Sequence, residues 1–384
     1  MPRGPKQLSY YSYDSLGNPW LSGGGAVRDF EILKRQRARW AGITYWTGRY
    51  PGFRAGDREG IRVRGLGWGR SYLISRITYT FCANLRLLWD RADAIGNSVS
   101  AYAPLLAGLL RPARFYLVAH HYVGGRSGEK YGLAGRVAWA CEWLLMRGCR
   151  RLIVSNRAVA ERVRGFNPGT QVLVTQNGFD DRLLDLPSAE AEIPYILFLG
   201  RFDIYMKGLD ILIRAFAGLD PARRGRTHLI LAGAASPKAL QAVAELIPPG
   251  MASSIALEPN VNEERKHALL AACLFFCSPS RFEGWGIAAL EANAAGKPAL
   301  VSRADGFLDS IKDAYSGVMV PVEDEAALAA AMADLIWDAA KRQALGANAR
   351  EWAKRFAWSR IAESEQVWLE ANLFGPRTTS KPRA

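Results

Sequence analysis

Two carboxylates separated by seven residues, Glu283 and Glu291, stand in the segment SRFEGWGIAALEANAAGKP at residues 280–298. At about 100° per residue, eight positions on one helix would turn the two side chains roughly 80° apart and two turns along the axis. If Glu283 instead lies in a loop, it can point over the helix N-terminus while Glu291 reaches up from the third turn. The free N–H groups of the first turn, at 284–286, suit an anion such as a phosphate. We therefore expect a loop that becomes a helix here and ends near Gly296, with both acids meeting one ligand.

Fixed positive charge stands upstream, in YILFLGRFDIYMKGLDILIRAF at residues 195–216. The apolar run 196–199 is typical of a buried parallel strand, and Arg201 and Lys207 follow in the connection to a helix that begins near Gly208. Ligands of open α/β sheets bind beyond the carboxyl ends of the strands, which is where both cations fall. Solvated surface is the simpler interpretation of either cation alone. Combined with the Glu283 segment, they indicate an anion site.

Two further features lie at expected strand ends in the first half of the chain. The triplet Gly23-Gly24-Gly25 allows a backbone to approach a bound group closely with its amide N–H groups exposed, although a flexible turn is the alternative. The doublet His120-His121 ends the strand FYLVA. A histidine there can hydrogen-bond a sugar hydroxyl or stabilise phosphate charge, or it can be hydrogen-bonded into a loop. The Gly-x-Gly-x-x-Gly pattern is absent, which argues against an NAD enzyme.

These segments resemble the group 1 family of retaining, sugar-nucleotide-dependent glycosyltransferases of GT-B architecture. The matching stretches are Gly200-Arg201 with Lys207-Gly208, and Glu283 to Glu291 continued by Ala292, Gly296 and Pro298. Weaker matches are the glycine triplet, Ser155 after a strand, Asn177-Gly178 before the linker and Trp358 near the end. The specific feature is the order of the two motifs, Arg-x5-Lys followed about eighty residues later by Glu-x7-Glu.

The resemblance implies an α/β fold with two Rossmann-like parallel-sheet domains that face a central cleft. We place the N-terminal, acceptor-binding domain at residues 1–185 and the C-terminal, donor-binding domain at 186–357. A helix at 358–376 is expected to pack back on the N-terminal domain, and residues 377–384 are expected to form a disordered tail. The linker candidate is 180–194, where proline and acidic residues interrupt the pattern.

Apolar or β-branched runs alternate with helical patterns along the chain, which favours parallel sheets with crossover helices. Strands are expected at 8–13, 43–47, 115–119, 151–154, 171–174, 196–199, 228–232, 254–257, 274–277 and 299–301. In the first half, helical patterns cover 26–40, 71–90, 134–148 and 156–164. The apolar stripe within 71–90 is predicted to pack on its own sheet, and it comprises Leu73, Ile77, Phe81, Leu85 and Leu88. In the alternative, Arg70, Arg76 and Arg86 lie against lipid.

The resemblance also implies roles for particular residues. Arg201 and Lys207 would bind the donor diphosphate, Glu283 the transferred sugar and Glu291 the ribose hydroxyls. His120 is carried over because the family has a histidine at this strand end, with His121 as the alternative. The implied catalytic residues are His120, Arg201, Lys207 and Glu283. The implied donor-binding residues are Gly24, Gly25, Arg201, Lys207, Asn260, Val261, Glu283, Gly284, Trp285, Gly286 and Glu291.

The implied reaction moves a hexosyl unit from a nucleoside-diphosphate sugar to a glycan or lipid-linked acceptor with retention, in cell-envelope or exopolysaccharide assembly. An Asp-x-Asp signature is missing from the expected strand ends, so we expect no metal and no cofactor besides the donor substrate.

The family commonly has Gly-Gly-x-x-Glu where this chain has 305–309, DGFLD, which leaves the phosphate contact there open. Residues 258–261, EPNV, lack a glycine near the base pocket, so UDP, GDP and ADP sugars remain alternatives. A non-catalytic or epimerase-type sugar-nucleotide-binding protein is the alternative function.

Positive charge is confined to the first half of the chain. Residues 1–190 hold 28 Lys and Arg against 14 Asp and Glu, a net charge of +14, whereas residues 191–384 hold 22 of each. Such a field attracts polyanions or anionic headgroups, at about 1 kcal/mol per basic residue near a membrane. Nucleic acid is the competing partner, but zinc-ligand spacing, a helix-turn-helix signal and an aromatic RNA-binding run are absent. We expect an anionic membrane surface to be the partner of the N-terminal domain, besides nucleotide sugar and acceptor.

Composition is consistent with a soluble, cytoplasmic enzyme, and the resemblance implies a peripheral position on the inner face of the cytoplasmic membrane. The 384 residues are 49% hydrophobic, enough for two cores, and the apolar runs fall short of the ~18 residues that cross a bilayer. The start MPRGPKQLSYYSY lacks the apolar stretch of a signal peptide. The five cysteines show no metal spacing and are expected to be reduced.

Overall fold

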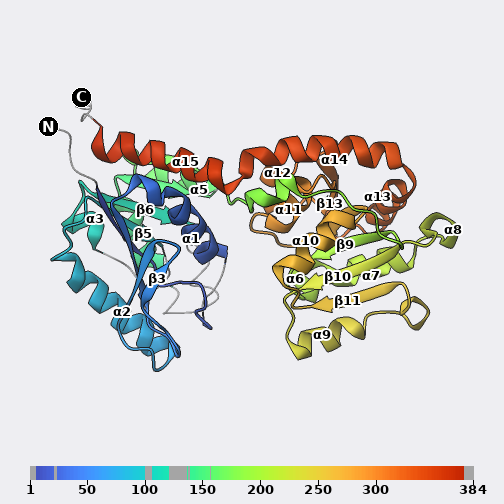
Figure 1. Ribbon diagram of the computed structural model, residues 1–384, viewed down its shortest axis with the longest axis horizontal. Coiled ribbons are helices and arrows are strands. Elements are labelled where there is room, and N and C mark those ends of the chain that lie inside the picture. The colour runs from blue at the N-terminus through green and yellow to red at the C-terminus, as the bar shows by residue number, and fades with distance from the viewer. Residues whose placement is uncertain are drawn as a thin grey trace. The chain divides into compact units, whose positions relative to one another are not determined.

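The computed structural model describes residues 6–20, 24–99, 106–120, 136, 139–155 and 157–375. Gly23, His121 and the tail 377–384, for which we made predictions, lie outside these described residues. The chain divides into two compact units (Figure 1). Residues 1–177 and 358–384 form the N-terminal unit, and residues 178–357 form the C-terminal unit.

The N-terminal unit is built on an eight-stranded sheet with the order β3-β4-β2-β1-β5-β6-β7-β8. Its strands are β1 (Gln7–Tyr11), β2 (Gly42–Gly48), β3 (Gly56–Arg58), β4 (Ile61–Leu66), β5 (Ala94–Ser98), β6 (Phe115–Ala119), β7 (Arg151–Val154) and β8 (Gln171–Val174). Neighbouring strands pair in parallel except β3 and β4. The helices include α1 (Gly24–Gln36), α2 (Tyr72–Leu87), α3 (Ala107–Leu110), α5 (Arg157–Phe166) and α15 (Trp358–Leu369), which η5 (Glu370–Phe374) extends.

Helices cover both faces of this sheet, as expected for parallel strands whose residues are buried on both sides (Figure 1). On one face, α2 and α5 contribute Tyr79 and Val163 to a core shared with Leu117. On the other, α1 and α15 contribute Leu33 and Leu369. The C-terminal helix therefore belongs to the N-terminal unit, where it contacts α1.

The C-terminal unit is built on a six-stranded parallel sheet with the order β11-β10-β9-β12-β13-β14. Its strands are β9 (Tyr195–Leu199), β10 (His228–Gly233), β11 (Ile255–Pro259), β12 (Phe275–Ser278), β13 (Ala299–Ser302) and β14 (Gly317–Val320). Its helices are α6 (Ile204–Lys207), α7 (Leu209–Ala217), α8 (Pro221–Arg224), α9 (Pro237–Ala244), α10 (Glu263–Ala272), α11 (Ile287–Ala294), α12 (Asp305–Ser310), α13 (Glu325–Trp337) and α14 (Ala339–Ala353).

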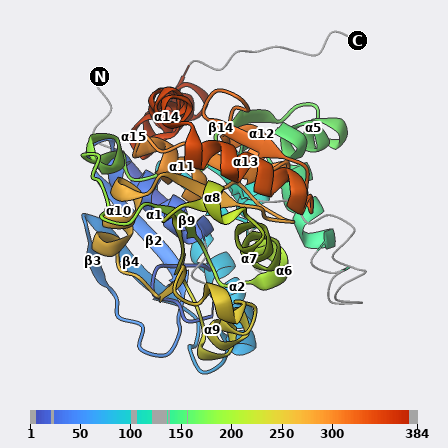
Figure 2. The ribbon, with the colours of Figure 1, turned by 90° about the vertical axis from the view of Figure 1, so that its right-hand side faces the viewer.

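Helices lie on both sides of this sheet (Figure 2), and a hydrophobic core lies on each face. The first contains Phe198 of β9 with Leu212 of α7 and Met332 of α13. The second contains Leu197 of β9 with Leu290 of α11, and Leu269 of α10 packs in it too. Consecutive residues of β9 thus point into opposite cores, which is why the segment 196–199 is an uninterrupted apolar run.

The boundary between the units differs from the predicted one. We placed it after residue 185, with a linker at 180–194, whereas the units divide between Asn177 and Gly178. Phe179 and Leu183 are 1% and 0% exposed and belong to a core of the C-terminal unit. Because these side chains are anchored there, the acidic segment that follows Gly178 includes a packed 3-10 turn, η2 (Asp181–Asp185).

The expected packing of α2 is also wrong. Leu73, Ile77 and Phe81 were predicted to face the sheet, but they are 66%, 60% and 69% exposed. The helix packs instead through its other face, which includes Ser75, Tyr79, Ala83 and Leu87. The apolar periodicity correctly predicted that α2 has two different faces. It gave the wrong face as the buried one.

A buried ion pair ties the N-terminal unit to its returning C-terminal helix. Arg28 of α1 and Glu365 of α15 are 2% and 3% exposed, and the guanidinium donates to the carboxylate. Thr175, just after β8, donates to Glu365 at 2.6 Å and accepts from Arg28 at 2.8 Å. Three segments far apart in sequence therefore share one polar cluster in the interior.

Glu365→Gln should destabilise the N-terminal unit by about 3 kcal/mol, because it leaves the buried Arg28 charge without its partner. Urea unfolding of the two proteins measures this difference. Glu363→Gln is the matched control, since Glu363 is 57% exposed and pairs with Arg39 at 3.2 Å. Glu363→Gln should lower the free energy of unfolding by less than about 1 kcal/mol. Equal effects of the two substitutions would contradict the prediction.

Candidate functional site

Lys207 and Glu283 form an ion pair in the C-terminal unit. Lys207 ends the single-turn helix α6 after β9, and Glu283 lies in the loop between β12 and α11. The Nζ of Lys207 is 2.7 Å from Oε2 of Glu283, and the side chains are only 20% and 14% exposed. Since β9 and β12 are neighbours in a parallel sheet, their carboxyl ends bring the two connections together. The structure thus joins two residues that lie 76 positions apart.

The main chain holds the two connections in register. The carbonyl of Met206, next to Lys207, accepts from the N–H groups of Arg281 and Phe282 at 3.0 and 3.3 Å. The guanidinium of Arg281 donates two hydrogen bonds to Asp210 in α7, at 2.8 and 2.9 Å. These hydrogen bonds hold the pKa of Asp210 below its usual value, although partial burial opposes the shift. Arg281 therefore braces the loop that carries Glu283 against the helix that follows Lys207.

The turn from Gly284 to Gly286 leads into α11. The N–H of Gly284 donates to Oε1 of Glu283 at 3.1 Å. Gly286 caps the helix in the left-handed region, with φ of 80°, and a Cβ there would lie 2.6 Å from the ring of Phe307. Glycine is therefore required at this position. Trp285 is 5% exposed and its side chain packs in the core. A ligand at this turn would therefore contact the main chain of Trp285 and not its indole ring.

Glu291 lies in the second turn of α11, because the helix begins at Ile287. We had expected it in the third turn, so that detail is wrong. Its Oε1 is 2.9 Å from Nζ of Lys266 in α10, and Lys266 also contacts Glu263 at 2.8 Å. Burial raises the pKa of Glu291, and the adjacent ammonium opposes the shift. Burial lowers the pKa of Lys266, but the two carboxylates outweigh it and the net shift is upward. Each acid of the Glu-x7-Glu motif is thus paired with a lysine from another element.

Arg201 follows β9 and is the most exposed of the predicted cations. Its side chain is 69% exposed, and its guanidinium lies 3.8 Å from Asp203. This long contact at the surface holds the side chain weakly. Arg201 remains available to an anion without displacement from a tight ion pair.

Asn260 and Val261 lie at the carboxyl end of β11. Asn260 has a φ of 55°, and its amide accepts from the N–H of Ala235 at 3.1 Å and donates to its carbonyl at 3.0 Å. The side chain of Asn260 therefore supports the loop after β10. Val261 is partly buried against the core.

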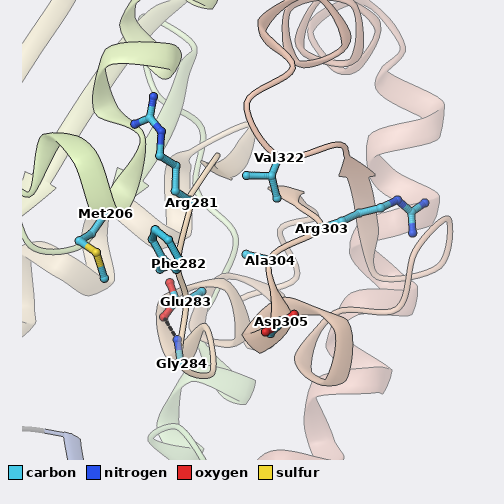
Figure 3. A pocket seen from close by; sticks show the side chains of 9 residues that line it. All are labelled: Met206, Arg281, Phe282, Glu283, Gly284, Arg303, Ala304, Asp305 and Val322. Atoms are coloured by element: carbon cyan, nitrogen blue, oxygen red, sulfur yellow. Dashed lines mark hydrogen bonds between the residues drawn. The ribbon is translucent and has the colours of Figure 1, made fainter. Parts of the chain in front are cut away.

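A pocket of about 400 Å³ opens beside Glu283 (Figure 3). In Figure 3, Met206, Phe282 and Glu283 lie on one side, and Ala304, Asp305 and Val322 on the other. The N–H of Gly306, at the start of α12, donates to the carbonyl of Glu283 at 3.1 Å. The segment DGFLD, which departs from the family pattern, is therefore attached directly to the loop that carries Glu283.

In the N-terminal unit, His120 follows β6 and lies against α1. Its Nε2 is 3.0 Å from Oγ of Ser98, with hydrogen-bond geometry, and 3.1 Å from Oδ1 of Asp29. Asp29 is 1% exposed, and neither of its oxygens has a well-aligned donor among the described residues.

Main-chain contacts fix this histidine in place. The hydroxyl of Ser155 donates to its carbonyl at 2.6 Å. A Cβ on Gly25 would lie 2.8 Å from Cδ2 of the ring, so glycine allows α1 to approach it closely. Gly24, by contrast, has open space on its Cβ side. Two predicted residues, Gly25 and His120, thus meet, and Asp29 and Ser98 join them.

Residues 187–352 match the family described as glycosyl transferases group 1. This range covers every strand of the C-terminal unit and both acids of the Glu-x7-Glu motif. This part of the chain is therefore similar to the group 1 glycosyl transferases.

Curated relatives agree with this assignment. The D-inositol 3-phosphate glycosyltransferase of Thermobispora bispora is 32% identical over 235 residues, which are 58% of this chain and 54% of the relative. The phosphatidyl-myo-inositol mannosyltransferase of Mycobacterium leprae is 31% identical over 168 residues, 44% of each chain. The chain spans about half the length of the curated relatives it matches.

Solved structures show the fold of the whole chain. Sucrose-phosphate synthase from Thermosynechococcus elongatus superposes with a TM-score of 0.74 at 18% identity, over 94% of this chain and 98% of that one. Anabaena HepE in complex with UDP-glucose gives 0.71 at 19% identity, over 95% and 100%. The two units of the chain therefore have the GT-B fold that we predicted.

Metal-ligating residues do not cluster in the part of the chain that the structure describes. No group of three or more His, Cys, Asp or Glu is placed to hold an ion there. The five cysteines are free thiols, and burial raises the pKa of Cys149 to about 12. Among the described helices, none has the length and apolar character to cross a membrane.

Sequence reasoning missed four residues that support the predicted ones: Lys266, Arg281, Asp29 and Ser98. Arg281 stands two positions before Glu283, so its nearness to the motif was a usable signal. Lys266 shows only a Glu263-to-Lys266 spacing typical of a helix surface pair, which does not point to Glu291. Contacts between different helices are not encoded in local spacing.

Lys266→Met should make the stability of the C-terminal unit fall more steeply with pH. Losing the ammonium raises the pKa of the buried Glu291 further. A carboxyl whose folded pKa exceeds its unfolded value stabilises below the unfolded pKa and loses that contribution as pH rises through the folded pKa. We expect little difference from the unsubstituted protein near pH 4 and a deficit of about 2 kcal/mol near pH 8, measured by urea unfolding.

Two controls accompany this measurement. Lys341→Met removes a lysine that is 42% exposed and pairs with Asp334, so its effect should be small at every pH. Adding Glu291→Gln to Lys266→Met should flatten the profile again. A steep profile in the double variant would show that another group is responsible.

Proposed function

We propose that this protein is a retaining glycosyltransferase that moves a hexosyl unit from a nucleoside-diphosphate sugar to a glycan or lipid-linked acceptor. The observation that carries the proposal is the half-buried Lys207–Glu283 pair beside the amide-rich turn of α11, within the group 1 domain. The names of the relatives, glycosyltransferase and mannosyltransferase, and the UDP-glucose in the HepE complex support a sugar-nucleotide donor.

The cations act on the donor diphosphate. Departure of a nucleoside diphosphate from an anomeric carbon leaves negative charge on phosphate oxygens, and fixed donors lower the barrier to its formation. Lys207 supplies a point charge, Arg201 a planar pair of donors, and the amides of 284–286 a preformed N-terminal turn. Arg201 is exposed enough to close onto a bound anion.

The two acids bind the sugars on either side of the diphosphate. A carboxylate that accepts two hydrogen bonds suits vicinal hydroxyls, so Glu283 holds the transferred sugar and Glu291 the ribose. Both are paired with lysines in this structure. Donor binding then turns Lys207 toward phosphate and leaves the Glu283 oxygens free to accept from sugar hydroxyls.

The N-terminal unit contributes His120 and the Gly24-Gly25 loop. His120 is the catalytic residue of this unit in our proposal, and its Nε2 lies 3.0 Å from Ser98 Oγ and 3.1 Å from Asp29 Oδ1. The imidazole would stabilise negative charge that develops on the reacting groups. Attack of the acceptor hydroxyl from the face that the leaving group departs gives retention. We propose no metal and no cofactor besides the donor.

The acceptor is expected in cell-envelope or exopolysaccharide assembly, with the protein cytoplasmic and peripheral on an anionic membrane. The net charge of +14 on residues 1–190 supports this placement.

A thermal-shift panel of UDP, GDP and ADP sugars identifies the donor sugar and its base, since a ligand at 100 times its Kd adds about 2.7 kcal/mol to the free energy of unfolding. Release of nucleoside diphosphate that depends on an acceptor separates a transferase from an epimerase or a binding module. Binding of no sugar nucleotide would refute the proposal.

Lys207→Met should lower turnover by about 10² to 10³, because one preorganised charge is lost where negative charge develops. The measurement is nucleoside diphosphate release with saturating donor. Lys341→Met, which removes a half-exposed lysine from α14, is the matched control and should leave turnover unchanged. Unchanged turnover in Lys207→Met would remove Lys207 from the mechanism.

A further inference from the structure

The most exposed apolar surface of the N-terminal unit follows one face of α2. Its members are spaced by three or four residues, so they form a single stripe along the helix. Their exposed fractions range from 44% to 69%, and they are Leu73, Ile77, Phe81, Leu85 and Leu88. Leu106 and Leu110, at the neighbouring α3, are 45% and 42% exposed and extend the patch. We call these seven residues the α2 face.

Folding of the unit does not require this face to be apolar. The helix is already anchored by Tyr79, Ala83 and Leu87, which belong to the core beneath it. Ser71 caps its N-terminus, and Leu106 is tied to the helix because its N–H donates to Asn84 at 2.7 Å. Contiguous apolar surface that contributes nothing to the core marks an interaction site.

Two exposed tryptophans accompany the stripe. Trp68 is 68% exposed and lies beside the middle of α2, where its N–H donates to Thr78 at 2.9 Å, and Trp89 follows the helix and is 62% exposed. Indole rings favour the boundary between hydrocarbon and water, because they combine a large apolar ring with one N–H donor. From Leu73 to Leu88 the stripe runs about 22 Å at 1.5 Å per residue. The 16 residues of α2 are too few to cross a bilayer, but they can lie along its surface.

Charge around the face selects an anionic partner. Residues 61–92 contain six arginines and a single acid, Asp90. Asp90 is 3% exposed and accepts hydrogen bonds from the Tyr11 hydroxyl and the Ala92 N–H. The stretch therefore presents no acidic group to solvent, whereas Arg70 and Arg91 are exposed. Arg76 is buried and lies over the rings of Tyr13 and Tyr72.

We propose that the α2 face lies in the interfacial layer of an anionic lipid bilayer, with α2 parallel to the surface and Trp68 and Trp89 at headgroup level. The apolar stripe inserts between the headgroups and the acyl chains, and Arg70 and Arg91 contact the lipid phosphates. The inference specifies the membrane contact that the proposed function includes, and it does not depend on the identity of the donor or acceptor. A protein partner would need acidic groups opposite the arginines as well as an apolar groove.

Flotation of the full chain with vesicles tests this inference. The protein should float with phosphatidylglycerol vesicles and bind at least tenfold less to pure phosphatidylcholine. Ile77→Glu combined with Phe81→Glu should lower binding to phosphatidylglycerol at least tenfold. Val367→Glu is the matched control, because Val367 is 56% exposed on α15, and it should bind like the unsubstituted protein. Arg70→Gln with Arg91→Gln should weaken binding at low salt and have less effect at high salt.

Three results would overturn the inference. The unsubstituted protein could fail to float with anionic vesicles, or the double glutamate variant could float as well as the control. Alternatively, the protein could be a dimer without lipid that the glutamates dissociate, which would make the face a contact between copies. If the double variant does not fold, as judged by circular dichroism, Leu73→Asn replaces it, with the same expectation of weaker flotation. Normal flotation with no sugar-nucleotide binding would instead count against the proposed function alone.

Discussion

The ion pair between Lys207 and Glu283 is the constraint around which the candidate site is arranged. Two opposite charges are held 2.7 Å apart with most of their surface removed from water, and neither would be stable there alone. Their positions depend on strands β9 and β12 being neighbours, on the Met206 carbonyl, and on Arg281 bound to Asp210. Changing any of these supports would move one charge relative to the other.

Glu291 repeats the arrangement with a different lysine. Burial alone would favour its protonated form, and Lys266 counteracts this from α10. A carboxyl accepts hydrogen bonds from hydroxyls on both oxygens only when it is ionised, so under the proposed function Lys266 acts through Glu291. The Lys266 contact with Glu263 at the helix surface keeps the ammonium in place. Both acids of the motif are thus largely buried and paired with a lysine from another segment of the chain.

β6, β7 and β8 have the predicted bounds. Complete burial is not the reason, because β6 is buried at every position whereas β8 is at most partly buried. β5 was missed because its sequence, AIGNS, buries Asn97, which donates to the carbonyl of Tyr11. β4 was missed because its apolar and arginine residues alternate at a sheet margin, where β3 is its other neighbour. Predicting the Glu283 loop worked because both acids cannot share a helix face. The partners Lys266 and Asp29 could not be predicted, since they depend on which helices pack together.

The error on α2 has a physical cause that bears on function. A hydrophobic stripe on a helix predicts that this face is buried in the core only if the face has no other apolar surface to contact. Here the opposite face, with Tyr79, Ala83 and Leu87 in the core, packs on the sheet instead, which leaves the apolar stripe outside. The surplus apolar surface and the surplus positive charge both fall in the N-terminal unit, whereas the paired lysines and acids fall in the C-terminal unit. Because the two groups of residues share no contacts among the described interactions, their substitutions should act additively. A double variant in α2 and at Lys207 should therefore lose vesicle binding and turnover by the same factors as the separate variants do.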